Sequence, residues 1–299
     1  MAGSIQISSG AAAAIEPSTG QVNPEDFAKS DLWIFREGRR EFSGPVFLRE
    51  LQERLEAKDA LIDCLIQAGE LEAALADLVA PGASAAAALT DSLASRLCGT
   101  PDARDPKQLV SRIEVPNTIS ISPPEGFTYY ALHSLDFANT VDRLANGSEA
   151  YAVIGIRSIG TTLSAVTSAK LTGLGKKATR ITVRPEGHPY SRSTQFSSLH
   201  RAWILQQQSV SAHFLIVDEG PGRSGSTFLS VAEALCRAGV HQDRITIVGS
   251  RPFDPAALCA QGAAERWRRF RFVYVSSLLS QRFETRRALS EVSARLSRR

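Results

Sequence analysis

The sequence predicts an α/β fold with a mostly parallel, doubly wound sheet, preceded by a helical N-terminal region and followed by a C-terminal extension. Residues 111–250 alternate short apolar stretches with helical patterns, an order typical of parallel strands connected by helices. Residues 26–110 instead repeat apolar side chains at intervals of three and four, which is the period of a helix. Residues 251–299 are rich in arginine. These observations divide the chain into a helical accessory region, an α/β core and a basic extension.

The first part of the chain is expected to be disordered and then helical. Residues 1–25 are rich in alanine, serine and glycine and show no apolar periodicity, so we expect disorder there. A helical pattern covers residues 47–78, and Gly69 within it is expected to separate two helices. A further helix is expected over residues 83–98, followed by a linker over residues 99–106.

The core is expected to contain six strand-like segments. They cover residues 117–122, 127–132, 150–156, 178–185, 213–219 and 244–250. The helices between them are expected to start near residue 134 and to cover residues 161–175, 199–208 and 227–239. Ligands of such sheets bind beyond the carboxyl ends of the strands. The loops after residues 156, 185 and 219 are therefore where a functional site is expected.

Composition and charge exclude several classes of protein. Four cysteines lie far apart without a C-x-x-C pair, a pattern that favours neither zinc nor disulfides and fits a reducing cytosol. No window has the ~20 apolar residues of a membrane span, and residues 1–20 lack a signal-peptide pattern. We therefore expect a cytoplasmic protein without membrane contact.

The net charge of +3 conceals a basic tail, because residues 265–299 hold ten arginines and three glutamates. Leucine, valine and phenylalanine are interleaved with these arginines, which favours a solvated helix face over contact with nucleic acid. The aromatic side chains of residues 267–272 are likewise expected to pack rather than to bind nucleic acid.

The loop that follows the strand at residues 213–219 has the clearest ligand-binding pattern. Asp218 and Glu219 end the strand, and glycines and hydroxyl side chains precede a helix that starts near Thr227. Backbone N–H groups in such a loop, with the positive end of the helix, favour a phosphate. Carboxylates can accept hydrogen bonds from sugar hydroxyls or help to hold Mg²⁺ through water. Together they fit a ribose 5-phosphate group, with the phosphate bound by Gly222, Arg223, Ser224, Gly225, Ser226 and Thr227.

Two other loops carry groups that suit anions. The first follows residue 156 and contains Arg157, Ser158, Ile159 and Gly160, where a guanidinium and free N–H groups favour a highly charged anion. The second contains Arg184, His188 and Arg192. His188 is a candidate to bind or to protonate a leaving group.

Together, these three loops resemble the phosphoribosyltransferase family, specifically its type I members, which bind 5-phosphoribosyl 1-pyrophosphate. The matching segments are GIRSIGTTLSAV, VRPEGHPY and DEGPGRSGST, within residues 125–250. The resemblance implies Mg²⁺-dependent transfer of ribose 5-phosphate to a nitrogenous base, with release of pyrophosphate. Two departures stand out: four residues, 220–223, separate the acids from the hydroxyl-glycine element where the family usually has three, and Pro185 and His188 replace lysines of the mobile catalytic loop.

The resemblance also implies roles for individual residues. Asp218 and Glu219 would contact ribose hydroxyls and hold Mg²⁺ through water, and Arg184 and His188 would act beside them in catalysis. Pyrophosphate would be bound by Arg157, Ser158, Ile159, Gly160 and Arg192. The acceptor base would be covered by Tyr129, Tyr130 and His133, although a half-buried strand packed on the N-terminal helices is an equally open interpretation of these three residues.

A finer resemblance is to uncharacterised bacterial phosphoribosyltransferase-like proteins of tellurium-resistance-type gene clusters, and a homodimer is compatible with the family. Several alternatives stay open. The same fold serves in regulators that sense the pyrophosphorylated sugar without catalysis, and a phosphorylase or hydrolase of a ribosyl phosphate would use the same cradle. The letters VDEGPGRSG also match the first glycine loop of S-adenosylmethionine-dependent methyltransferases, but that loop follows the first strand of its sheet. A glycine-rich turn without a ligand is the remaining alternative.

Overall fold

A computed structural model describes residues 38–57, 61–122, 124, 126–127, 132–145 and 147–275. The expected disordered segment, most of the expected strand over residues 127–132 and much of the basic tail lie outside these residues. Tyr129 and Tyr130 are among those outside. Among the described residues, no helix is long and apolar enough to cross a membrane.

The centre of the molecule is a five-stranded parallel sheet, which confirms the predicted α/β class. Its strands, in spatial order, are β4 (Lys177–Val183), β3 (Ala150–Ile156), β7 (His213–Val217), β8 (Ile245–Gly249) and β9 (Arg271–Tyr274). Within this sheet the chain forms β3 first, then β4 at the edge, and then β7 on the other side of β3. Loops that leave neighbouring strands β3 and β7 therefore diverge, and such a switch point is where open α/β sheets bind ligands.

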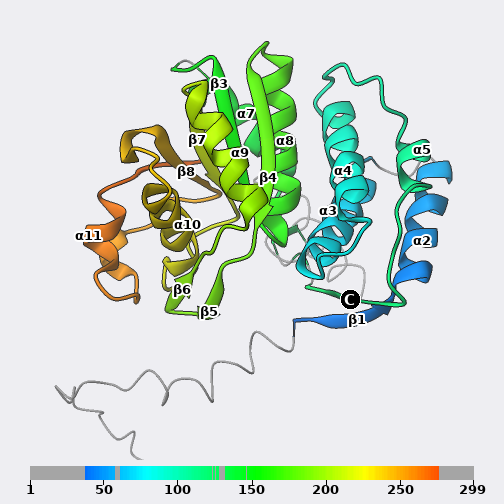
Figure 1. Ribbon diagram of the computed structural model, residues 1–299, viewed down its shortest axis with the longest axis horizontal. Helices are drawn as coiled ribbons and strands as arrows, with labels where there is room; N and C mark the ends of the chain where they lie inside the picture. The colour runs from blue at the N-terminus through cyan, green and yellow to red at the C-terminus, as the bar shows by residue number, and fades with distance from the viewer. Residues whose placement is uncertain are drawn as a thin grey trace, which may run out of the picture.

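Helices cover both faces of the sheet (Figure 1). One face packs on α9 (Ser198–Ser209), α10 (Ser226–Arg237) and the short α11 (Ala263–Trp267), and the other packs on α7 (Ser134–Leu144) and α8 (Ile159–Gly173). Phe214 and Ile216 point into the first core, whereas Leu215 and Val217 point into the second. This alternation explains why β7 is apolar throughout: a central parallel strand is buried on both faces.

A helical region lies beyond α8, on its side away from the sheet (Figure 1). It consists of α2 (Gly44–Ala57), α3 (Leu61–Asp77), α4 (Ala83–Leu97), α5 (Pro106–Val110) and the antiparallel pair of β1 (Arg40–Ser43) and β2 (Thr118–Ile121). Its apolar core includes Ala165, Val166 and Ala169 of α8. Helix α8 is therefore packed between the sheet and the helical region. This arrangement explains why α8 is buried almost all round.

The prediction that Gly69 separates two helices is wrong. Helix α3 runs from Leu61 to Asp77 without a break. A Cβ atom at Gly69 would lie 2.1 Å from the Oγ1 atom of Thr162 on α8. The glycine is therefore needed for close approach of two helices, and not for a helix end.

Two strands differ from the sequence prediction. The expected strand at residues 117–122 forms as β2, but it pairs with β1 outside the main sheet because Ile119 and Ile121 belong to the core of the helical region. The fifth strand of the sheet, β9, lies in the segment that the sequence predicts to be a basic extension, so the sheet continues past residue 250. Trp267 and Phe270 are buried beside it.

The remaining short elements lie in the loops. Strands β5 (Glu186–His188) and β6 (Ser191–Ser193) form a hairpin after β4, and two turns of 3₁₀ helix, Gln242–Arg244 and Pro255–Ala257, flank β8. The hairpin contains two of the residues that the sequence singled out, His188 and Arg192.

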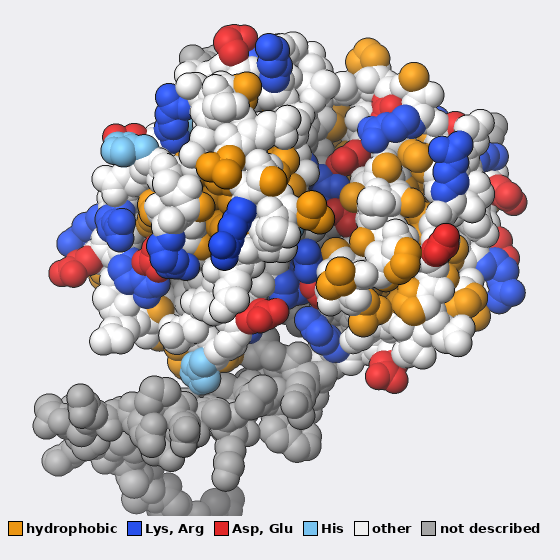
Figure 2. All heavy atoms as spheres, viewed as in Figure 1, with side chains coloured by type: hydrophobic (Ala, Val, Ile, Leu, Met, Phe, Trp, Pro, Cys, Tyr) orange, Lys and Arg blue, Asp and Glu red, His pale blue; other side chains and the backbone are white. Residues whose placement is uncertain are grey.

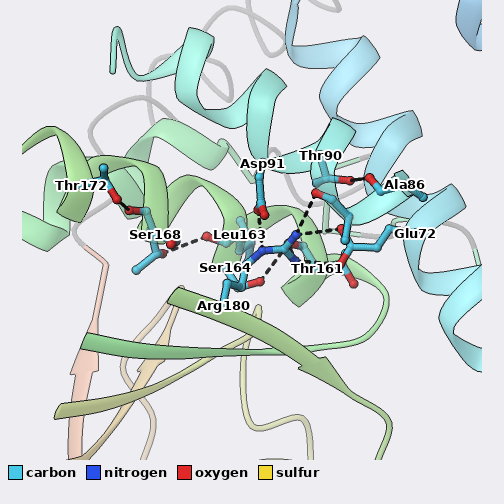
Figure 3. A network of polar contacts seen from close by, with 12 residues as sticks. Glu72, Ala86, Thr90, Asp91, Thr161, Leu163, Ser164, Ser168, Thr172 and Arg180 are labelled. Atoms are coloured by element: carbon cyan, nitrogen blue, oxygen red, sulfur yellow. Dashed lines mark hydrogen bonds and ion pairs between the residues drawn. The ribbon is translucent and has the colours of Figure 1, made fainter. Parts of the chain in front are cut away.

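Buried charges attach the helical region to the sheet. Arg180 of β4 donates hydrogen bonds to both carboxylate oxygens of Glu72 on α3, each at 2.9 Å, and to Asp91 on α4 at 2.7 Å. Figure 3 shows this guanidinium between the three elements. The side chains of Arg180 and Glu72 are only 3% and 4% exposed. We refer to Arg180, Glu72 and Asp91 as the Arg180 cluster.

Candidate functional site

A cleft of about 510 Å³ lies at the carboxyl edge of the sheet, beside the switch point between β3 and β7. It is lined by Gly38, Arg39, Ser122, Ile156, Arg157, Ser158, Ile159, Arg184, Pro185, Arg192, Asp218, Glu219, Gly220, Gly222, Thr227 and Arg251. Nine of the predicted site residues are thus brought together. On the face seen in Figure 2, side chains of both charges gather in the hollow between the sheet and the helical region.

Asp218 and Glu219 enter the cleft directly from the end of β7. The N–H group of Asp218 donates to the carbonyl of Val248 at 3.3 Å, and the carbonyl of Glu219 accepts from the N–H group of Ser250 at 2.6 Å. These bonds fix the two acids against the end of β8. The sequence prediction of an acidic pair at this edge is therefore consistent with the geometry.

Burial raises the pKa of Asp218 to about 7. The charge of Glu219 also raises it, whereas the backbone N–H groups of Glu219 and Gly160 and the positive charge of Arg184 lower it. A carboxyl group with this environment is stabilised in its charged form by any cation that enters the cleft. Asp218 is thus suited to a ligand that brings positive charge with it.

Gly160 lies next to Asp218 rather than lining the cleft. A Cβ atom at this position would lie 2.6 Å from the carbonyl oxygen of Val217 and 3.1 Å from the Oδ1 atom of Asp218. The glycine allows the first turn of α8 to pack against the end of β7. Ser158, immediately before α8, has φ of +102°, a strained conformation of the kind that clusters at functional sites.

The arginines at the ends of β3 and β4 are both bound to Asp77, the last residue of α3. Arg184 donates from Nη2 to Asp77 Oδ2 at 2.7 Å and from Nε to Oδ1 at 3.1 Å. Arg157 donates from Nη1 to Asp77 Oδ1 at 3.0 Å. Arg39 approaches the same carboxylate at 3.8 Å. We refer to Asp77, Arg157 and Arg184 as the Asp77 cluster.

The remaining charges make this part of the cleft basic. Arg192 donates from Nη1 to the carbonyl of Gly187 at 2.8 Å. Burial lowers the pKa of Arg192, and the positive charges of Arg184 and Arg39 lower it further. Because the like charges lie close enough to act on one another, the cleft would gain stability from a bound anion.

Two serines of the predicted phosphate loop are turned away from the cleft. Ser224 donates from Oγ to the carbonyl of Pro189 at 2.8 Å, and the Oγ of Ser226 bonds to the same carbonyl. Both are buried. Their hydroxyls therefore contact the β5–β6 hairpin, whereas the sequence prediction has them contact a phosphate.

The other members of this loop serve mainly in packing. Gly225 has φ of +70°, and a Cβ atom there would lie 2.5 Å from the indole nitrogen of Trp267. The carbonyl of Arg223 accepts from the N–H group of Cys259 at 2.9 Å. Of the expected phosphate residues, Gly222 and Thr227 line the cleft.

Neither of the predicted histidines lines the cleft. The Nδ1 atom of His188 accepts from the N–H group of Tyr190 at 3.3 Å, and its Nε2 atom is buried with no partner among the described residues. His133 begins α7, where its Nδ1 atom accepts from the N–H group of Leu135 at 3.3 Å. The predicted proton donor and the predicted acceptor contact thus have local structural roles here.

Asp77, Arg39 and Arg251 belong to this site but were not predicted from the sequence. Arg39 and Arg251 are in segments without a recognisable motif, and Asp77 ends a helix 80 residues before Arg157. No motif or spacing in the sequence links Asp77 to the residues of the cleft. The only available signal was an acidic residue at the end of α3, where the helix dipole disfavours negative charge unless a cation compensates it.

The acidic pair can contribute to a Mg²⁺ site but cannot complete one. In the part of the chain that the structure describes, no group of three or more histidine, cysteine, aspartate or glutamate residues could hold a metal ion. Mg²⁺ is commonly held by one or two carboxylates together with phosphate oxygens of the substrate and water. Asp218 and Glu219 fit that type of site.

Comparisons of this chain with protein families, with curated proteins and with solved structures find no match.

Proposed function

We propose that the chain is a phosphoribosyltransferase, which uses 5-phosphoribosyl 1-pyrophosphate and Mg²⁺ to transfer ribose 5-phosphate to a nitrogenous base or a related acceptor. One observation carries the proposal: the acidic pair at the end of β7 shares a cleft at the switch point with arginines from the ends of β3 and β4. A sugar hydroxyl pair and a diphosphate have the chemistry that these two groups recognise.

In the proposed reaction, the bond from the anomeric carbon to pyrophosphate breaks and a bond from that carbon to an acceptor nitrogen forms. The nitrogen loses a proton to solvent. Asp218 and Glu219 accept hydrogen bonds from the ribose hydroxyls and balance the positive charge that develops on the ring. Arg157 and Arg184 balance the negative charge of the departing pyrophosphate. Such orientation and charge compensation need no covalent nucleophile.

Two further parts of the proposed ligand, its 5-phosphate and the bound Mg²⁺, fit the same cleft. The 5-phosphate would lie at the start of α10, bound by backbone N–H groups of the loop and by Thr227, because Ser224 and Ser226 are engaged with Pro189. Asp218 and Glu219, together with phosphate oxygens, would hold Mg²⁺, which would supply positive charge near the leaving group. The methyltransferase alternative is not favoured, since this loop follows the third strand of the sheet in chain order.

A second candidate function is a sensor that binds the pyrophosphorylated sugar without turning it over. The observation that favours it is the engagement of both Arg157 and Arg184 by Asp77, together with the position of His188 away from the cleft. A protein of this kind would bind the ligand and transmit the event through the helical region.

The test is a thermal-shift titration of the full chain with 5-phosphoribosyl 1-pyrophosphate and Mg²⁺, followed by pyrophosphate detection with a panel of bases. A transferase shows stabilisation and releases pyrophosphate with at least one base. Asp218→Asn combined with Glu219→Gln should lower the ligand affinity at least about tenfold, because two charge-assisted contacts are lost, and should abolish the release.

The matched control combines Asp142→Asn with Glu149→Gln, which neutralises two exposed acids in surface ion pairs with lysines and should leave binding and release unchanged. Stabilisation without release with any base would favour the sensor. Absence of stabilisation at millimolar ligand would contradict both functions.

A further inference from the structure

Asp77 accepts hydrogen bonds from Arg157 and Arg184, the two arginines that a bound anion would contact. Its carboxylate is 22% exposed and accepts hydrogen bonds from Arg184 and Arg157 at 2.7–3.1 Å. Although burial of Asp77 acts to raise its pKa, the hydrogen bonds and charges of Arg184 and Arg157 prevail and lower it. The carboxylate is thus held in its charged form, as a bound anion would be.

The remaining contacts of the two guanidinium groups are to neutral acceptors. Arg157 donates to the carbonyls of Ala76 and Thr182 and to the hydroxyl of Thr182, and Arg184 donates to the carbonyl of Arg157. These contacts fix the position of both guanidiniums. Among the described acceptors of this pair, Asp77 is the only one with a negative charge.

The Asp77 cluster has a net positive charge, so it attracts an anion with more negative charge than a single carboxylate. Asp77 contributes one negative charge to two guanidiniums, and Arg39 lies 3.8 Å from the same carboxylate. Replacing a single carboxylate with an anion of higher charge and more oxygens gains Coulomb energy and hydrogen bonds. A cavity of about 10 Å³ lies beside Asp77, between α3 and the first turn of α8.

We infer that Asp77 is an internal competitor at the anion site, which sets the threshold that a ligand must exceed to bind Arg157 and Arg184. An anion that needs both guanidiniums must displace the carboxylate. Its apparent affinity is therefore reduced by the fraction of molecules in which Asp77 is released. This fraction belongs to the protein, so every anion that uses the pair is weakened by the same factor. Only ligands with high intrinsic affinity, such as a diphosphate, then bind at low concentration.

The inference concerns anion binding alone and does not require transferase activity. It is tested on the full chain by calorimetric titration with inorganic pyrophosphate and, separately, with inorganic phosphate, without sugar or acceptor. We expect Asp77→Asn to strengthen binding of both anions at least about tenfold, by factors that agree within roughly threefold. Failure of the proposed transfer reaction would leave this result unaffected.

Glu233 provides a matched control outside the cleft. Its carboxylate is 21% exposed and is bound by both Nε and Nη2 of Arg266, at 2.7 and 2.8 Å, so Glu233→Gln removes an equivalent ion pair. We expect no change in either titration. Asp77→Ser serves as a second variant if the amide of Asn substitutes for the carboxylate by accepting from the arginines, and it should show the same strengthening.

Three results would overturn the inference. Unchanged affinity for pyrophosphate in both Asp77 variants would show that the carboxylate does not compete. Weaker binding in variants that retain the wild-type circular dichroism spectrum would show that Asp77 positions the arginines for the ligand. Absence of pyrophosphate binding to wild type and to both variants would show that the pair is not an anion site.

Discussion

Helix α3 is joined to the sheet by two groups of charged side chains that differ in burial and in the balance of charge. The Arg180 cluster places two acids around one guanidinium, and Arg180 and Glu72 are 3% and 4% exposed. The Asp77 cluster places two guanidiniums around one acid, and its members are 14–24% exposed. The Arg180 guanidinium and Glu72 are closed to solvent, and only Asp91 at the edge of this cluster is partly exposed, at 36%. The Asp77 cluster borders the cleft and keeps an excess of positive charge.

This difference separates a structural role from a binding role on one helix. A buried guanidinium whose charge is compensated by two acids has nothing left to offer a ligand, and its removal leaves Glu72 as an uncompensated buried charge. A partly exposed cluster with surplus positive charge can exchange its internal acid for an external anion. We therefore expect stability to depend mainly on the Arg180 cluster and ligand affinity mainly on the Asp77 cluster.

The largest expected effect is that of Arg180→Ala. It leaves Glu72 buried without its cation, and breaking such a pair costs about 3–5 kcal/mol of unfolding free energy. Arg184→Ala should cost only about 1 kcal/mol, because Asp77 is partly solvated and keeps Arg157. Urea unfolding followed by circular dichroism measures both. Equal losses in the two variants would remove the distinction between the clusters.

Helix α3 shows which features of the fold could be predicted from the sequence and which could not. Its apolar period, like that of the core helices and strands, is a local property, so the class of fold could be predicted from it. The meaning of Gly69 could not, because it depends on contact with Thr162, which lies 93 positions further along the chain. The same holds for Asp77 and Arg157.

The loop after β7 shows the same division at the site. The sequence of this loop correctly predicted that the two acids lie at the carboxyl edge of the sheet, because the direction and order of the strands decide where each strand ends. The sequence did not predict the direction of the serine hydroxyls in this loop. Ser224 and Ser226 turn to Pro189, a residue of a hairpin whose position depends on tertiary packing.

A smaller effect is expected from Gly69→Ala, which tests whether the close approach of α3 to α8 holds the Arg180 cluster in place. The added methyl group would lie 2.1 Å from the Oγ1 atom of Thr162, and overpacking of this kind costs about 1–3 kcal/mol. Thr162→Ala in the same chain should restore part of the loss, as measured by urea unfolding. A Gly69→Ala variant with wild-type stability would show that the helices can separate without cost.

The smallest effect is expected from Glu70, a third acid of α3, which has neither the full burial of Glu72 nor the arginine contacts of Asp77. Burial raises the pKa of Glu70 from 4.5 to about 7, although the charge of Arg54 opposes this. Because the folded protein holds this proton more tightly than the unfolded chain does, the contribution of Glu70 to stability is complete below pH 4.5. It is lost as the pH rises to about 7.

Glu70→Gln should therefore leave stability near that of wild type at pH 4.5 and raise it by about 1 kcal/mol at pH 8, a value reduced from the full pKa shift because the group is partly exposed. Thermal unfolding of both proteins across this range isolates Glu70, since every other titrating group is shared. Arg54→Gln should steepen the loss of stability in the wild-type background, because it removes the charge that favours the ionised carboxylate. If the difference in stability between Glu70→Gln and wild type did not vary with pH, Glu70 would be as well solvated as an acid on the surface. Glu70, Glu72 and Asp77 would then differ only in their partners, and burial would not distinguish the closed part of the helix from the part that borders the cleft.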